Sequence, residues 1–489
     1  MSLLPDWASR RTSPRIVLVH TVTFRQARSF VPAVIPIIAA TGFGGGRTTV
    51  VLLVVAVTLV SLLTAALTWW RFTYADGPAA VVVTRGLLSR SVRTVPNDRI
   101  RGVEIEAPVL HRLFGLVRVR IDAAAGAVQG KDEELLVDGV TRAEADRLRV
   151  AVLTHRSAPG LPATDVAAQP AEEEFARFDN RWLLYAPLVG GYLAVPLAAV
   201  GALFRLTDEL PARFRPHLDE ATLFDGRLLV LAAIAAVVVL TLGSVVGAAV
   251  VNWGFRLVRR GGSLVAVRGL VTRRHTELEV DRIRGCTVAE GVGMRLVGAA
   301  RVNALVTGLG DATRRGQLLP LGPRAEAWRL TRRLVADPGP LRRHPAAARQ
   351  RRVVRAMSAG VAVTVAGVAV TALAGWWELL VAGVVLTALG LPLGLGRYAA
   401  LGHAVGPESL AVRGGWLVRQ EAVLERRAVV GWRVHQSFFQ RRAGLATVVA
   451  CVGAGSGGYA AMDMAADEIP AFAAAASGSW AETFSRPAR

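Results

Sequence analysis

The sequence predicts an α+β membrane protein built from three repeats, each a transmembrane helical hairpin followed by a small β-rich domain that ends in a helix. Three observations predict this class: an internal repeat, apolar runs of membrane-spanning length, and alternating β-branched segments between them. Of the 489 residues, 52% are hydrophobic and only 19% are charged, against roughly 25% charged in an average soluble domain. We therefore assign the excess of apolar residues to membrane spans.

The internal repeat is clearest in two short motifs. Arg85-Gly-Leu87 recurs as Arg268-Gly-Leu270, and Asp98-Arg-Ile-Arg-Gly102 recurs as Asp281-Arg-Ile-Arg-Gly285, both with the same shift of 183 residues. A third copy at a shift of 329 keeps the glycines but reads Arg427-Ala-Val-Val430 where the central motif would stand. A common shift indicates that one unit was copied without internal insertions.

The chain opens on an arginine-rich segment, residues 1–29, before a predicted hairpin at 30–70. Its first span, 30–43, is short and contains two prolines. Its second span, 48–70, is long enough to cross about 30 Å of hydrocarbon and ends at Trp69-Trp70, a residue type typical of the membrane interface. No small-residue cleavage site stands out, so we expect a retained span and not a secretory signal.

The first domain is predicted over residues 71–156 and is mostly β. Runs at 79–84, 89–95 and 117–122 alternate or concentrate β-branched residues, and turns containing Gly or Pro separate them. Thr141-Arg-Ala-Glu144 is a capping box, which predicts the start of a closing helix.

The same order of hairpin and domain follows twice more. Closing helices are predicted after Pro323 in the second domain and at Ile469–Ala476 in the third. The predicted boundaries are a linker at 157–181, a hairpin at 182–251 with spans at 182–204 and 228–251, a domain at 252–337, a basic linker at 338–355, a hairpin at 356–396 with spans at 356–374 and 379–395, a degenerate domain at 397–480 and a tail at 481–489.

Charge predicts the orientation of these spans. The formal net charge is +21, and arginine carries almost all of the positive charge. The loops on one side of the predicted hairpins hold five basic and six acidic residues, whereas the rest of the chain holds 53 basic and 31 acidic residues. Because positively charged segments stay on the cytoplasmic side, we expect both termini and all three domains in the cytoplasm.

A β-rich unit of about 80 residues, closed by a helix and preceded by a transmembrane hairpin, resembles the bacterial membrane-flanked domain. The Arg-Gly-Leu turn, the Asp-Arg-Ile-Arg-Gly segment and Arg112-Leu-Phe-Gly-Leu116 carry this resemblance, which covers all three repeats. It implies a pleckstrin-homology-like (PH-like) fold, a small barrel or sandwich of two sheets capped by a C-terminal helix, in a multi-repeat protein of the bacterial inner membrane. Arg101 and Arg284 stand where that family tends to have glutamine.

The predicted function is non-enzymatic: three cytoplasmic PH-like domains displayed as a binding or assembly platform. The expected partners are membrane lipids, together with a protein partner or a second copy of the chain, and no nucleic acid is expected. Arginines near an anionic membrane surface contribute about 1 kcal/mol each, although the same Asp-Arg motifs could instead fix turns at strand ends. The candidate contact patch consists of Arg85, Arg90, Arg99, Arg101, Arg268, Arg273, Arg282 and Arg284.

Enzyme, metal and cofactor sites have little support in the sequence. The eight histidines are scattered and the two cysteines lack metal-like spacing, so no catalytic residue, metal or cofactor is predicted. Gly453-Ala-Gly-Ser-Gly-Gly458 matches a dinucleotide fingerprint, but no βαβ unit follows it. An enzyme would require Asp98, His111 and Asp122 to meet in a buried site.

The alternative function is that of a transporter or a lipid-handling protein that uses the bundle of six spans. Transporters usually place ionisable residues inside the bilayer, and the predicted spans contain none. A polar, water-lined path between the spans would favour this alternative. A tightly packed apolar bundle would count against it.

Overall fold

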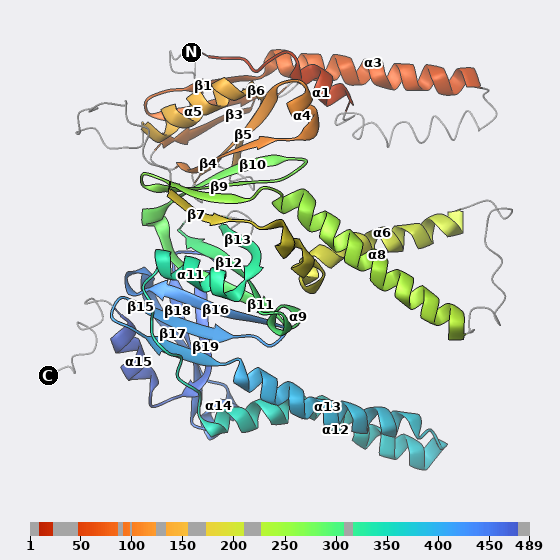
Figure 1. The fold of residues 1–489 in the computed structure, drawn as a ribbon, viewed down its shortest axis with the longest axis vertical. Coiled ribbons are helices and arrows are strands. Elements are labelled where there is room, and N and C mark those ends of the chain that lie inside the picture. The colour runs from red at the N-terminus through yellow and green to blue at the C-terminus, as the bar shows by residue number, and fades with distance from the viewer. Residues whose placement is uncertain are drawn as a thin grey trace. The chain divides into compact units, whose positions relative to one another are not determined.

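The computed structural model forms two compact units, and Figure 1 labels their helices and strands. The first comprises Met1–Glu173 with Gly254–Glu277, and the second comprises Glu174–Trp253 with Leu278–Arg489. The second repeat therefore contributes its first strands to one unit and the remainder to the other. The residues that the structure describes are 9–22, 47–86, 91–97, 100–123, 134–154, 173–209, 226–307 and 316–477.

In the first unit, the first repeat folds as two packed antiparallel sheets, β1–β2–β3 and β4–β5–β6, with helix α5 against them. One hydrophobic core joins the two sheets and the helix, and Val81, Val119 and Leu148 are fully buried in it. This is the architecture that the resemblance implied. The elements are β1 (Thr73–Asp76), β2 (Ala80–Arg85), β3 (Ser91–Pro96), β4 (Ile100–Ala107), β5 (Leu116–Ala123), β6 (Glu134–Thr141) and α5 (Arg142–Thr154).

The predicted closing helices are present in all three repeats. The hydroxyl of Thr141 accepts a hydrogen bond from the backbone N–H of Glu144 over 3.3 Å, so the threonine caps α5 as the sequence indicated. Helix α11 (Arg324–Leu334) begins directly after Pro323, and α15 spans Ile469–Ala476.

The first unit also contains the first three strands of the second repeat, β8 (Arg256–Arg260), β9 (Ser263–Arg268) and β10 (Arg273–Glu279). Strand β10 pairs antiparallel with β4, with Arg273 opposite Ala107 and Thr276 opposite Glu104. The second repeat thus continues a sheet of the first repeat. The sequence did not predict this sharing of sheets.

The second unit repeats the arrangement. Its six-stranded sheet has the order β13–β12–β11–β16–β15–β14, in which β11 belongs to the second repeat and β16 to the third. Strands β17, β18 and β19 form a three-stranded sheet that shares one core with β15, β16 and α15. The bounds are β11 (Ile283–Gly291), β12 (Ala299–Val306), β13 (Gln317–Pro323), β14 (Gly402–Val405), β15 (Ser409–Gly414), β16 (Val418–Glu425), β17 (Val429–His435), β18 (Leu445–Val452) and β19 (Gly458–Ala465).

The shared sheets keep one register. Glu290 lies opposite Arg419 in the β11–β16 pair, and these two residues are the repeat equivalents of Ala107 and Arg273 in the β4–β10 pair. The domain boundaries at 71–156, 252–337 and 397–480 stay predictions, because the sheets run across them.

The turn that marks each repeat depends on a glycine. Gly86, Gly269 and Gly415 are equivalent and have φ angles of 122°, 108° and 88°, a region that other residues rarely adopt. A Cβ on Gly269 would also lie against the carbonyl oxygen of Thr272. These constraints explain why the third copy keeps this glycine although it has lost the central motif.

The turn also receives a contact from the preceding repeat. In the first unit, Arg112 Nη1 donates a hydrogen bond to the carbonyl oxygen of Leu270 over 3.1 Å. In the second unit, its equivalent Arg295 donates from Nη2 to the carbonyl oxygen of Trp416 over 2.7 Å. Leu270 and Trp416 both follow the turn glycine. The Arg-Gly-Leu turn and the motif that begins at Arg112 looked independent in the sequence. They are therefore the two sides of one contact between successive repeats.

Three helices of the described residues are long and apolar enough to cross a membrane: α8 (Gly226–Asn252), α12 (Ala346–Ala374) and α13 (Glu378–Ala399). They coincide with the spans predicted at 228–251, 356–374 and 379–395. The predicted span at 48–70 is one continuous helix, α3 (Arg47–Arg71). The span predicted at 30–43 lies outside the described residues.

The span predicted at 182–204 is not one straight helix. The 3-10 helix η3 (Asn180–Leu188) and α6 (Gly190–Glu209) meet at 74°, and only the two together would make a fourth span. Pro187 lies in η3 and two glycines open α6, and both residue types weaken a continuous helix. Leu183 and Ala186 of η3 are buried in the second unit, so this stretch belongs to the packed domain.

Helices α12 and α13 form a closely packed hairpin (Figure 1). A Cβ on Gly367 would lie 2.6 Å from the Cα atom of Leu380, and one on Gly390 would lie 2.8 Å from the Cα atom of Met357. Small residues thus let the two backbones approach, which is the usual basis of helix packing in membranes. This contact counts against a water-lined path between these two helices.

Candidate membrane-interface site

The structure places two of the predicted patch residues, Arg282 and Arg284, against groups of their own unit. The Nε atom of Arg282 lies 2.6 Å from the carboxylate of Glu279. Arg284 donates from Nη1 to the carbonyl oxygen of Asp281 over 2.8 Å and lies 3.7 Å from Glu425. Local partners therefore engage both arginines, as expected of residues that fix the end of a strand. Their contact with lipid stays a prediction.

The other predicted patch residues that the structure describes lie on four strands of the first unit. In the first unit, Arg85 is exposed at the end of β2, Arg268 is buried at the end of β9, and Arg273 is exposed at the start of β10. Arg101 lies on β4. Arg90 and Arg99 lie outside the described residues.

A short helix between the fourth and fifth strands presents apolar side chains to solvent in every repeat. These helices are α4 (Val109–Leu113), α9 (Val292–Leu296) and α14 (Phe438–Arg442), and they occupy equivalent positions in the sequence repeat. Leu113 is 74% exposed, Leu296 is 85% exposed and Phe439 is 71% exposed. Val109, Val297 and Phe438 beside them are exposed too, and contiguous apolar surface of this kind is typical of a contact with a membrane or another protein.

Each of these helices lies beside an element that adjoins a predicted membrane span. Side chains of α4 and its C-terminal end pack with α1 (Ile16–Val22) and with Trp69 at the end of α3. Helix α9 packs on η3, which leads into α6. Helix α14 and the first turns of α12 line a common groove. The exposed apolar residues are thus placed where a membrane interface would meet the domains, and we call α4, α9 and α14 the interface helices.

A partly buried carboxylate holds the first interface helix. Asp138 of β6 lies 2.8 Å from His111 of α4, 3.3 Å from His20 of α1 and 3.1 Å from Arg118 of β5. Burial alone would raise the pKa of Asp138, but the hydrogen bonds from His111 and His20 and the charge of Arg118 outweigh it and hold the pKa far below its usual range. His111 therefore meets Asp138, whereas Asp98, which an enzyme site would have needed, lies outside the described residues.

A second carboxylate performs the same task in the third repeat. Asp463 of β19 is fully buried. It accepts hydrogen bonds from Gln440 of α14 over 2.8 Å and from Arg352 of α12 over 2.6 Å, and it also binds Arg351. Gln440 is the repeat equivalent of His111. One side chain thus ties β19 to both an interface helix and a helix that can span the membrane.

The second repeat lacks such a carboxylate bond at the equivalent of His111. Met294 occupies this position and is buried. Arg301 is the equivalent of Arg118, and burial lowers its pKa although the nearby Tyr192 raises it. The second interface helix is therefore held by the apolar packing of Met294. At the equivalent position, the other two interface helices are held by a hydrogen bond from His111 or Gln440.

The groove between α12 and α14 has a volume of about 750 Å³. Arg355 of α12 and Arg442 of α14 line it, and neither has an acidic partner among the described residues. No acidic side chain of the described chain lines the groove. The lining residues are Ala347, Gln350, Arg351, Val354, Arg355, Ser358, Ser437, Phe439, Arg442 and Ala443.

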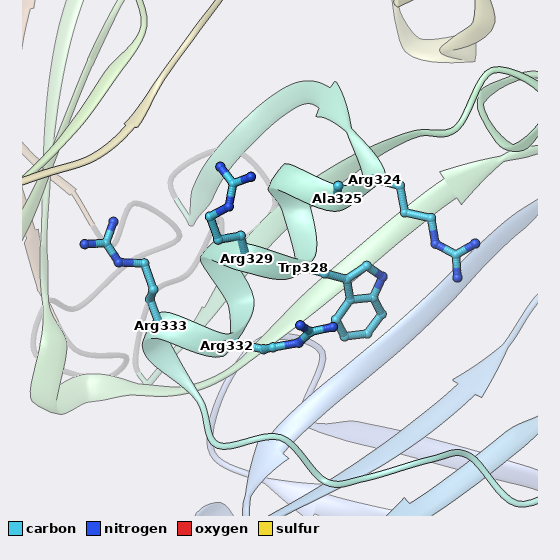
Figure 2. Close-up of a pocket in the computed structure, with 6 residues that line it drawn as sticks. All are labelled: Arg324, Ala325, Trp328, Arg329, Arg332 and Arg333. Atoms are coloured by element: carbon cyan, nitrogen blue, oxygen red, sulfur yellow. The ribbon is translucent and has the colours of Figure 1, made fainter.

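Helix α11 carries a second basic surface, around a hollow of about 640 Å³. Figure 2 shows Trp328 and Arg332 projecting from one side of the helix. Here each arginine has a partner: the guanidinium of Arg333 lies 4.3 Å from the ring centre of Phe175, and the others face carboxylates. The ion pairs are Arg324 with Glu290, Arg329 with Glu326, and Arg332 with Asp337.

The described residues contain no group of three or more His, Cys, Asp or Glu side chains that could hold a metal ion. Cys286 and Cys451 are free thiols. Burial, with the nearby charge of Glu425, raises the pKa of Cys286 to about 12, so this thiol is not disposed to react as a thiolate.

Comparison with known proteins agrees with this architecture. The model of a family described as Bacterial PH domain matches three segments, residues 28–155, 195–337 and 360–474, which together make up most of the chain. The chain belongs to the bacterial PH domain family. The resemblance found in the sequence is confirmed, and the family points to a non-catalytic protein.

One similar relative is the UPF0699 transmembrane protein YdbT of Bacillus subtilis (strain 168). It is 24% identical over 269 residues, which are 52% of this chain and 54% of that protein. The match thus spans about half the length of the relative. No solved structure matches this bacterial PH domain chain.

Sequence reasoning missed the residues of the groove. Phe438 and Phe439 are adjacent aromatic residues, and Arg355 is the last residue of the predicted basic linker. Their meeting depends on how α14 packs beside α12, which no local pattern encodes. The available signal was the short element between the fourth and fifth strands, which the sequence marked only by Arg112-Leu-Phe-Gly-Leu116.

Proposed function

We propose that this bacterial PH domain protein is a non-enzymatic platform anchored in the inner membrane, with its termini and its three PH-like domains on the cytoplasmic side. The interface helices touch the membrane surface, and basic residues beside them attract anionic lipid. Other surfaces recruit a protein partner or a second copy of the chain. The basic surface of α11 is the best candidate for a partner with acidic side chains, which would compete for its arginines.

One observation carries the proposal: equivalent short helices expose apolar residues beside elements that adjoin apolar helices in all three repeats. Burying such residues at a bilayer boundary gains roughly 25 cal/mol per Å² of apolar area. Tethering raises the local concentration of lipid, so weak contacts suffice. The family, the transmembrane relative and the charge distribution support the same function. The close packing of α12 on α13 does not favour the transporter alternative.

Fluorescence quenching tests the membrane contact in the full chain. A polarity-sensitive probe is attached at Leu113→Cys or Leu296→Cys in a Cys451→Ala background, and the protein is placed in nanodiscs. Lipids with a nitroxide near the headgroup should quench both probes strongly. They should quench a probe at Arg329→Cys on α11 weakly. Equal quenching at all three positions would overturn the proposed contact.

Thiol labelling tests the orientation. In intact bacterial spheroplasts, a membrane-impermeant maleimide should leave Arg329→Cys unmodified, and it should react once the membrane is opened. Reaction in intact spheroplasts would place the second PH-like domain outside the cytoplasm and reject the proposed topology.

A further inference from the structure

We propose that the groove between α12 and α14 binds the headgroup of one anionic phospholipid. This inference rests on the function proposed above and makes it specific, because it assigns a lipid site to the third repeat. That repeat has lost the Asp-Arg-Ile-Arg motif, so the site does not depend on the basic patch that the sequence predicted.

Charge selects an anion for this groove. Arg355 and Arg442 project from the two walls, and no carboxylate of the described residues neutralises either of them. The arginines of α11 differ, since Arg324, for example, lies 3.0 Å from Glu290. A guanidinium without a carboxylate partner is free to form the paired hydrogen bonds that it makes with phosphate.

The remaining lining suits a headgroup with attached acyl chains. The hydroxyl of Ser437 accepts a hydrogen bond from the backbone N–H of Gln440 and keeps its own proton for a phosphate oxygen. Phe439 adds an exposed aromatic ring at the rim. Val354, Val361 and Val365 are exposed along α12, at spacings that place them on one helix face. Acyl chains can lie along this face while the headgroup occupies the groove.

A single buried side chain holds both walls in place. Asp463 binds Gln440, which belongs to α14, and it binds Arg351 and Arg352, which belong to α12. The groove is thus formed before a lipid arrives. Binding therefore loses little conformational entropy in ordering the side chains of the site. Because α12 can itself span the membrane, a groove beside its first turns would lie close to the bilayer surface that supplies the lipid.

Native mass spectrometry of the full chain in detergent tests the site. Phosphatidylglycerol and phosphatidylcholine with identical acyl chains are added in turn. The wild type should retain one phosphatidylglycerol in preference to phosphatidylcholine. Arg355→Gln with Arg442→Gln should weaken that retention on the order of tenfold. The control, Arg349→Gln with Arg433→Gln, removes two exposed arginines outside the groove and should bind like the wild type.

Each other outcome has a definite meaning. An equal loss of phosphatidylglycerol retention in the two double variants would overturn the groove as a specific site. It would indicate that surface charge attracts the lipid without a defined site. Absence of any preference for phosphatidylglycerol in the wild type would contradict the lipid contact of the proposed function, and with it the site. Binding of soluble glycerol phosphate as tightly as the lipid would show an anion site that ignores acyl chains, which also overturns the inference. Melting temperatures of the variants within a few degrees of wild type exclude misfolding as the cause.

Discussion

Arg352 and Asp463 join a PH-like domain to α12, a helix long and apolar enough to span a membrane. The Nε atom of Arg352, in the second turn of α12, lies 2.6 Å from a carboxylate oxygen of Asp463 on β19. Asp463 has no solvent exposure and has a φ angle of 59°, the one positive value of a non-glycine residue in the described chain. A residue held in this region costs stability unless its surroundings fix it, and here four polar partners do so, counting His344, which contacts its carbonyl oxygen.

Replacing the carboxylate should therefore be costly. Asp463→Asn keeps the size of the side chain but leaves Arg351 and Arg352 half-buried without an anion, and we expect a loss of about 3 kcal/mol in the free energy of unfolding. Thermal unfolding of the full chain in detergent measures it. The matched control is Asp467→Asn, an exposed aspartate nearby, which should change stability by less than about 0.5 kcal/mol. Equal melting of the two variants would show that the buried pair does not fix the domain.

The equivalence of His111 and Gln440 gives a second prediction. Since Gln440 donates to Asp463 as His111 does to Asp138, His111→Gln should keep most of the bond and cost less than about 1 kcal/mol. His111→Met copies the second repeat but leaves the carboxylate of Asp138 short of one donor, and should cost about 2 kcal/mol. Melting curves at neutral pH rank the two variants. The reverse ranking would contradict the assigned role of His111.

A pair of buried histidines predicts acid sensitivity in the third repeat. The rings of His344 and His403 are in contact, with Nε2 of the first 3.2 Å from Nδ1 of the second. Burial, together with the charges of His344 and Arg342, lowers the pKa of His403 to about 4. Burial also lowers the pKa of His344, although the carbonyl oxygen of Asp463 opposes this shift.

The sign of the effect follows from these lowered pKa values. A histidine in the unfolded chain titrates near pH 6.5. Between about pH 6.5 and 4, this histidine is therefore protonated in the unfolded chain but not in the folded domain. The stability that His403 contributes is therefore complete above pH 6.5 and falls by on the order of 3 kcal/mol toward pH 4. His403→Phe keeps an aromatic ring against Phe472 and removes this titration. Its melting temperature should fall less steeply with pH than that of the wild type, and parallel curves would reject the prediction.

The contact between repeats gives a fourth prediction. Arg295→Ala removes the hydrogen bond to the carbonyl oxygen of Trp416, and a bond from a charged donor is worth about 1.5–3 kcal/mol. The loss should be local, so hydrogen exchange should accelerate in Val418–Glu425, the strand that begins beside this turn. Arg329→Ala on α11 provides the control and should leave that strand unchanged. Faster exchange throughout the second unit would indicate general destabilisation instead.

Short sequence patterns predicted the structural features that depend only on residues close together in the chain. The turn glycines, typified by Gly269, follow from a backbone angle, and the start of α5 follows from the side chain of Thr141. The spans now seen as α8, α12 and α13 follow from length and composition. Each of these features depends only on residues that are close together in the chain. The sequence alone is therefore enough to predict it.

The remaining features depend on partners that are distant in sequence. Pairing of β4 with β10 joins strands more than 160 residues apart, and alternation of side chains does not say which strand lies next to which. Pro187 and the glycines after Leu188 indicate a kink in the predicted span, but the angle of 74° depends on how η3 packs in the second unit. Arg355 and Arg442 could not be brought together from sequence, because their distance depends on the packing around Asp463.

The manner in which successive repeats share sheets gives the chain a polarity. The fourth strand of repeat one and the fourth strand of repeat two each accept the third strand of the next repeat, and β4 offers Glu104 to Thr276 and Glu106 to Arg274. In the last repeat, the equivalents of those glutamates are Arg433 and His435 on β17, the end strand of its described sheet. A charged side chain such as that of Arg433 on an edge strand discourages further pairing. The edge strand of the third repeat thus differs in charge from the strands through which the first two repeats pair with their successors.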